Sequence, residues 1–184
     1  VRTAAEVARV VVAARERETV AVQAVGSSSI ALRSELVGLA IGLEPGRVVY
    51  LPLSHRAAGE LDLGGHEGMN LPELGADPMA PLVALLEDPA VRKTGHDLKL
   101  ALLLLRRAGV ELRGLSFDVM LASYLLEPGR REHELDSLAL QHLGHSAMSY
   151  EDLCGKGRGV VPVAECTIDR VRDYACDCLL YTSD

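Results

Sequence analysis

Residues 35–53 have the sequence ELVGLAIGLEPGRVVYLPL, which contains two apolar segments joined by the turn Glu44-Pro45-Gly46-Arg47. Pro and Gly in so short a connection are typical of tight turns, and the flanking segments are rich in aliphatic residues that favour strands. Two strands with a short turn between them pair in an antiparallel sense. Residues 35–53 therefore predict a β-hairpin.

The sequence on either side of this hairpin alternates between strand and helix patterns. Residues 19–25 form a third apolar, strand-like segment, and Thr3 with Glu6 gives the capping-box pattern at the start of a helix over 3–17. Further along the chain we expect a short strand over residues 91–94 and helices over 79–86, 97–108, 118–126, 135–143 and 167–179. This order predicts an α/β domain in which a mixed sheet is flanked by helices.

Residues 54–78 interrupt this pattern with a stretch that is rich in Gly and acidic residues and has no periodicity. A connection of this length is uncommon inside a compact domain. We expect a surface loop there and assign it no chemistry.

The composition excludes several classes of protein. The chain has 184 residues, which suits one domain, and its net charge of −7 argues against a basic nucleic-acid wrapper or a polybasic membrane binder. Aromatic residues make up 3%, with one Phe and no Trp, so a surface that stacks several bases is not expected. No apolar run approaches the ~18 residues of a membrane span. We therefore expect no membrane partner and a cytoplasmic location.

The last quarter of the chain contains four cysteines, which we expect to be reduced thiols in the cytoplasm. The alternative is a zinc site that uses them with His142 or His145, but the Cys-x-Cys pair lacks a matching second pair. The cysteines are Cys154, Cys166, Cys176 and Cys178.

Several segments resemble the 3′–5′ exonuclease domain of bacterial family A DNA polymerases (DNA polymerase I). The most specific of them is FDVMLASYLLEPGR, and the resemblance extends over residues 1–178 almost without gaps. It implies a ribonuclease H-like mixed sheet flanked by helices and a proofreading-type domain of a polymerase. Residues 179–184 depart from the family, and we expect them to be a truncated or non-native tail. The segments that carry the resemblance are residues 35–53, 85–99, 109–128, 133–138 and 149–157.

Active members of the family hold two divalent ions, Mg²⁺ or Mn²⁺, with four carboxylates, and they also use a tyrosine. The resemblance places these groups in an Asp-x-Glu motif on a strand, an Asn-x-x-x-Asp motif on the central helix and a Tyr-x-x-x-Asp motif on the last helix. Such spacings put both residues of each motif on one face of a strand or a helix. In this chain the motif positions are occupied by Gln23 and Val25, Asp97 and Ala101, and Tyr174 and Cys178.

All four metal carboxylates are thus replaced, whereas Tyr174 is retained. Because hard cations require oxygen ligands, we predict that the chain has no metal cofactor and no hydrolytic activity. The alternative is an active metal-dependent exonuclease that removes nucleotides from DNA 3′ ends. Its ions would be held by the remaining oxygen ligands, namely Gln23, Asp97 and Asp177.

Four residues are candidates for contact with DNA, namely Asp97, Lys99, Arg130 and Tyr150. The resemblance implies that Lys99 lies beside the central helix motif and that Tyr150 occupies an aromatic position that packs a terminal base. Residues 92–113 also form one locally basic stretch. Since the whole chain is acidic, we expect weak, salt-sensitive contact with a single-stranded 3′ end.

The resemblance also implies a partner, the polymerase domain of the same native chain, which this domain would brace. A third hypothesis is a free-standing binder of single strands. Two further patterns receive structural interpretations: Asp136, near His133, is expected to cap a helix that begins near Ser137, and residues 155–157 (Gly-Lys-Gly) lack the frame of a phosphate-binding loop.

Overall fold

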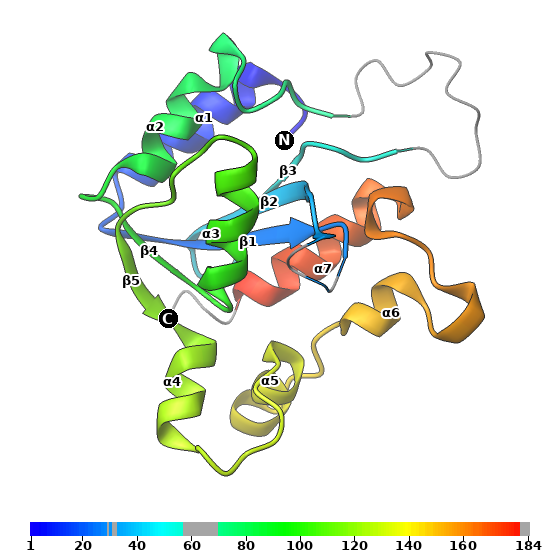
Figure 1. Cartoon of the computed structure of the whole chain (residues 1–184). Helices are drawn as coiled ribbons and strands as arrows, with labels where there is room; N and C mark the ends of the chain where they lie inside the picture. The colour runs from blue at the N-terminus through cyan, green and yellow to red at the C-terminus, as the bar shows by residue number, and fades with distance from the viewer. Residues whose placement is uncertain (29, 31–32, 57–69, 181–184) are drawn as a thin grey trace.

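The computed structural model describes residues 1–28, 30, 33–56 and 70–180. Five strands form one sheet in the order β3-β2-β1-β4-β5 (Figure 1). The pairs β1–β2 and β2–β3 are antiparallel, whereas β1–β4 and β4–β5 are parallel. The predicted mixed sheet and its hairpin are therefore confirmed. The strands are β1 (Thr19–Gly26), β2 (Leu36–Glu44), β3 (Arg47–Pro52), β4 (Arg92–Gly95) and β5 (Leu115–Asp118).

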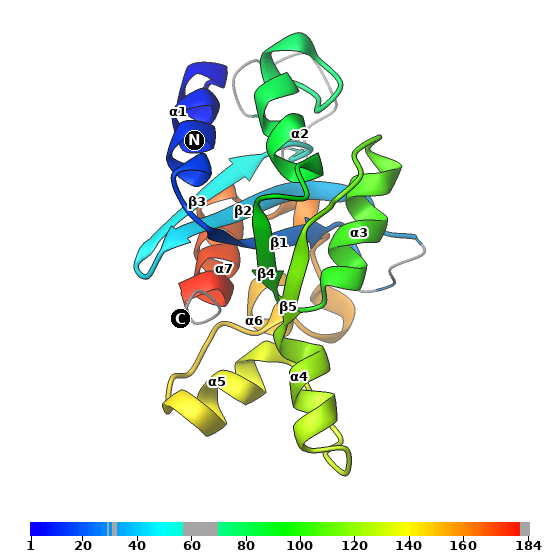
Figure 2. The ribbon, with the colours of Figure 1, turned by 90° about the vertical axis from the view of Figure 1, so that its left-hand side faces the viewer.

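Helices cover both faces of the sheet, and two of them extend beyond it (Figure 2). Helices α1 to α3 pack on one face and α7 on the other, while α4 and α5 lie past the end of β5. The α-helices are α1 (Ala4–Arg15), α2 (Ala80–Glu87), α3 (Leu98–Arg107), α4 (Val119–Leu126), α5 (Leu135–Leu143), α6 (Tyr150–Cys154) and α7 (Ile168–Leu180). Short 3₁₀ helices are η2 (Asp77–Met79), η3 (Gly157–Gly159) and η4 (Val163–Glu165). None of the described helices is long and apolar enough to cross a membrane.

The alternation of side chains along β1 separates two hydrophobic cores. Val20, Val22 and Ala24 belong to the core under α1, α2 and α3. Ala21 and Val25 belong to the core under α7. Gln23 therefore points to the α7 side of the sheet, on the same face as Val25.

One strand and one α-helix were absent from the sequence prediction. Strand β5 has only four residues, most of them exposed, because it is the edge strand of the sheet. Helix α6 has five residues and depends on a capping box between Ser149 and Asp152 instead of an apolar repeat. Both elements are too short to give a periodic pattern.

The predicted cap at Asp136 is wrong by two residues. Helix α5 begins at Leu135, with Glu134 as its N-cap, so Asp136 lies inside the first turn. There its carboxylate accepts a hydrogen bond of 2.7 Å from the backbone N–H of Ser137.

Parts of two predicted segments lie outside the described residues. These are residues 57–69 of the predicted loop and residues 181–184 of the predicted tail. The described end of the loop overlaps η2, and Leu179, which belongs to the predicted tail, lies in α7 and is fully buried.

Candidate nuclease-like cleft

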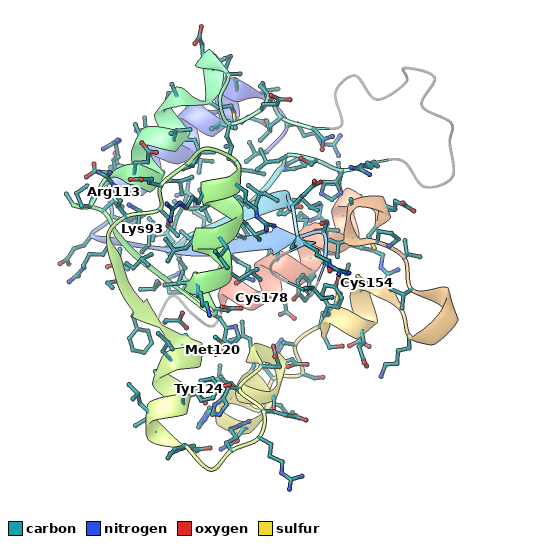
Figure 3. All side chains as sticks on the ribbon, in the orientation of Figure 1. Lys93, Arg113, Met120, Tyr124, Cys154 and Cys178 are labelled. Carbon is teal, nitrogen blue, oxygen red and sulfur yellow. The ribbon has the colours of Figure 1, made fainter. Side chains whose placement is uncertain are left out.

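A cavity of about 390 Å³ lies where β1 meets α5, α6 and α7. It brings together four of the predicted motif and DNA-contact residues, namely Gln23, Tyr150, Tyr174 and Cys178. Figure 3 shows Cys178 on α7 and Cys154 on the neighbouring α6. The other described lining residues are His96, Glu132, Glu134, Leu135, Asp136, Ser137, Ala147, Met148, Ser149 and Glu151.

The strand side of this cavity offers one neutral oxygen ligand. The side-chain oxygen of Gln23 is buried and has no hydrogen-bond partner among the described residues. Val25, on the same face of β1, is 4% exposed and packs into the core under α7. An aliphatic side chain cannot coordinate an ion, so the strand provides none of the negative charge that a divalent cation requires.

The central helix also presents no carboxylate to the cavity. Asp97 has a left-handed backbone (φ 51°) and its side chain caps α3 by accepting a hydrogen bond of 3.2 Å from Leu100 N. Ala101 is 3% exposed and packs between α3 and the sheet. Neither Asp97 nor Ala101 is among the residues that line the cavity.

On the last helix, Tyr174 and Cys178 lie one turn apart and both face the cavity. Burial raises the pKa of the Tyr174 phenol, and it raises the pKa of the Cys178 thiol to about 12. Both groups are therefore neutral at pH 7. A buried neutral thiol is a poor substitute for a carboxylate as a ligand of Mg²⁺.

Asp177, the remaining candidate ligand on α7, is held elsewhere. Its carboxylate contacts Nε2 of His145 at 3.0 Å and accepts a hydrogen bond of 2.9 Å from the backbone N–H of Met148. These contacts fix the chain segment that leads into α6. Asp177 does not line the cavity.

The cavity nevertheless has an acidic lining that the sequence analysis did not identify. Glu132, Glu134, Asp136 and Glu151 all line it, and none of its described lining residues is Lys or Arg. Glu134, Asp136 and Glu151 lie in residues 133–138 and 149–157, two of the segments that carry the family resemblance. Their place in these segments was the one sequence feature that could have pointed to them. Among the described residues, no group of three or more His, Cys, Asp or Glu side chains is arranged to hold a metal ion.

His96 is a further lining residue that the sequence analysis missed. It is 8% exposed, and its Nε2–H donates a hydrogen bond of 2.7 Å to the backbone carbonyl of His133. The His133 ring in turn contacts Ser123 Oγ at 2.8 Å and stacks on Tyr124. These contacts tie the start of α3 to the segment before α5, which is a structural role.

The four predicted DNA-contact residues do not lie together. Tyr150 lines the cavity, and burial raises the pKa of its phenol to about 12. Lys99 lines a separate groove of about 350 Å³ beside α3. Arg130 is held by Glu127 at 3.3 Å and by Ser137 Oγ at 3.0 Å, while Asp97 caps α3.

The basic stretch over residues 92–113 forms one surface only in part: Lys99, Arg106 and Arg113 line the groove beside α3. Arg92 pairs with Glu18 at 2.6 Å, and Arg113 pairs with Glu111 at 2.5 Å. Lys93 is fully buried on β4 and donates a hydrogen bond of 2.5 Å to the carbonyl of Asp88. Within the described stretch, the basic side chains therefore gather in the groove beside α3, where Glu111 partly offsets their charge.

We expect the substitution Lys93→Met to change how stability depends on pH. Burial lowers the pKa of Lys93 to about 8, below the usual value of a lysine in an unfolded chain. Between about pH 8 and pH 10 the unfolded chain then binds more protons at this residue, so its contribution to stability rises with pH. The measurement is a urea titration of both proteins at pH 8 and at pH 10. From pH 8 to pH 10, the free energy of unfolding of the parent chain should rise on the order of 1 kcal/mol more than that of the variant. If the free energy of unfolding changed equally with pH in the two proteins, the lowered pKa of Lys93 would be contradicted.

Comparison with known proteins supports a nuclease-like architecture. The sequence profile of the family described as "DNA polymerase I, ribonuclease H-like domain" matches residues 69–166. DNA polymerase I of Rhizobium leguminosarum is 35% identical over 174 residues, which cover 89% of this chain. The chain spans 17% of the length of that relative and 17% of a second DNA polymerase I, from Pseudomonas aeruginosa.

Two solved structures are similar in fold. Pol1 of M. smegmatis, solved as a POL domain with DNA primer-template and dNTP, matches with a TM-score of 0.63 and 26% identity, over 95% of this chain and 24% of that one. RNase D of Escherichia coli matches with a TM-score of 0.63 over 98% of this chain and 41% of that one, at 16% identity. The predicted ribonuclease H-like fold is therefore confirmed.

Proposed function

Because the chain belongs to the family of ribonuclease H-like domains of DNA polymerase I, we propose that it is an exonuclease-like domain that no longer hydrolyses DNA. In this proposal it serves the polymerase as a structural module. Its cleft retains the shape of a nuclease site without the ligands for the two metal ions.

The observation that carries this proposal is the placement of the residues at the motif positions. Gln23 and Cys178 line the cavity as neutral groups, whereas Val25 and Ala101 are packed into the two hydrophobic cores. In-line displacement at a phosphodiester with two metals needs ligands that fix both ions a few Å apart. Neutral side chains on β1 and α7 cannot provide that charge.

The carboxylates that remain do not compensate for these losses. Asp97 and Asp177 bind backbone N–H groups, and the acids that line the cavity do not form a metal-holding group among the described residues. Their negative charge also repels the phosphates of a DNA strand. Contact between the isolated chain and a single-stranded 3′ end is therefore proposed to be weak, and the domain is proposed to act in the cytoplasm within the polymerase.

A nuclease assay tests the proposal. The purified chain is incubated with a 5′-labelled single-stranded oligonucleotide and Mg²⁺ or Mn²⁺, with EDTA as the control. We expect no shortening beyond the background seen in EDTA. Stepwise loss of 3′ nucleotides that EDTA abolishes would support the alternative, an active exonuclease with a rearranged metal site.

A further inference from the structure

Helix α3 has apolar residues on its outer side as well as on the side that faces the sheet. Residues spaced by three, four and seven positions share one face of a helix. Lys99, Leu102, Leu103 and Arg106 have this spacing, and both leucines are half-buried. The outer face of α3 therefore presents two leucines between two cations. The residues that the helix buries toward the sheet are Leu98, Ala101, Leu104 and Leu105.

This outer face forms one wall of the groove of about 350 Å³ beside α3. The other wall is the segment between α3 and β5, on which Figure 3 shows Arg113 and in which Leu112 is 5% exposed. Figure 2 shows α3 on the side of the sheet away from α7. None of the described residues that line the groove also lines the acidic cavity. The groove is thus a separate site with a floor of leucines.

The rim of the groove is basic, although the chain as a whole carries a net charge of −7. Lys99, Arg106 and Arg113 line it, and Glu111 is the one acid among its described lining residues. Arg113 is paired with Glu111, whereas Lys99 and Arg106 form no salt bridge with any described residue. These two cations are therefore available to an acidic partner.

We propose that the groove binds an acidic amphipathic helix of a partner protein. With a rise of about 1.5 Å per residue, α3 separates Lys99 from Arg106 by about 10 Å along its axis. A partner helix with acids at positions i and i+7 and leucines at i+3 and i+4 has the same spacing. Lying along the groove, it places its leucines on the apolar floor and its acids opposite the two cations.

A nucleic-acid strand fits this groove less well. None of the described lining residues is aromatic, so bases have no ring on which to stack. The Glu111 carboxylate repels phosphates, whereas it can accept a hydrogen bond from a donor of a peptide. The inference goes beyond the proposed function and does not depend on whether the cleft hydrolyses DNA, because the two sites share no lining residue in the described chain.

The test titrates a fluorescein-labelled peptide with this chain and measures fluorescence anisotropy. The probe contains the sequence Glu-Ala-Ala-Leu-Leu-Ala-Ala-Glu and is extended with Ala and Gln to about 16 residues, because shorter helices are marginal in water. We expect saturable binding in the micromolar range. Peptides with Lys in place of both Glu residues, or with Ser in place of both Leu residues, should bind at least tenfold more weakly.

The variant Lys99→Glu/Arg106→Glu tests the cations directly. It should bind the acidic peptide at least tenfold more weakly than the parent chain does, and it should bind the Lys peptide more tightly than the parent does. Its far-UV spectrum and Tm should stay unchanged, since both side chains are exposed. The matched control is Arg2→Glu/Arg9→Glu, which reverses two exposed cations at the same spacing on and before α1 and should bind like the parent.

Lack of saturable binding by the parent chain, or equal weakening by both variants, would overturn the proposal. It would also be overturned by a single-stranded oligonucleotide that displaces the peptide from the parent and binds more tightly, because the groove would then belong to nucleic acid. Sedimentation that shows a stable dimer of the free chain, dispersed by Lys99→Glu/Arg106→Glu, would assign the groove to a second copy instead.

Discussion

A fourfold variant that restores the metal carboxylates is expected to shorten a 5′-labelled single strand from its 3′ end in the presence of Mn²⁺. Two ions held by carboxylates would activate a water and stabilise the leaving 3′ oxygen, so the rate should exceed that of the parent chain by about two orders of magnitude or more. The substitutions are Gln23→Asp, Val25→Glu, Ala101→Asp and Cys178→Asp.

The variant places carboxylates at three positions that are buried in the parent chain. Val25, Ala101 and Cys178 are 4%, 3% and 7% exposed, so the metal-free variant should be less stable than the parent, and Mn²⁺ should raise its Tm. The matched control is the single variant Cys178→Asp, which adds one ligand and should remain inactive. A folded fourfold variant that degrades no DNA would show that the elements around the cleft no longer stand in the geometry of a nuclease.

Replacing Gly95 with alanine is expected to lower the free energy of unfolding by about 3 kcal/mol, because the added methyl group overpacks the sheet. A Cβ at this position of β4 would lie 2.5 Å from the carbonyl oxygen of Val22 and 2.8 Å from a methyl carbon of Leu98. The first of these atoms belongs to the backbone of β1, so relief requires the strands to move apart.

The matched control for this substitution is Gly129→Ala. A Cβ at Gly129 would meet nothing within 4 Å, and its backbone φ is not positive. Urea titrations should give the control a free energy of unfolding within about 0.5 kcal/mol of the parent value. A comparable loss in both variants would mean that the close approach of β4 to β1 does not limit the size of residue 95.

The sequence predicted much of the fold because its strongest patterns were long and buried. The hairpin over residues 35–53 appears as β2 and β3, and the capping box of Thr3 and Glu6 begins α1 as expected. Strand β5 gave no signal, because an edge strand of four largely exposed residues has neither length nor alternation. Its place next to β4 depends on backbone pairing that composition does not reveal.

The cleft was predictable only in part. The motif positions implied by the family resemblance included Gln23, Tyr174 and Cys178, and the structure places all three along the cavity. Spacing did not show that the carboxylates of Asp97 and Asp177 accept hydrogen bonds from the backbone N–H groups of Leu100 and Met148. Both hydrogen bonds depend on local backbone geometry. The acidic lining extends from Glu132 to Glu151 and depends on how α5 and α6 lie relative to β1 and α7. That arrangement is set by contacts between residues far apart in the sequence, which local patterns do not reveal.

The most direct test of the account is a titration of the unmodified chain with Mn²⁺, followed by electron paramagnetic resonance of the free ion. The account predicts that the free-ion signal rises as it does in buffer, up to millimolar Mn²⁺, because Gln23 and Cys178 offer no charge and Asp97 and Asp177 are engaged elsewhere. Depletion of the signal by one or two ions per chain, reversed by Gln23→Ala, would contradict it and place a working metal site in the cleft.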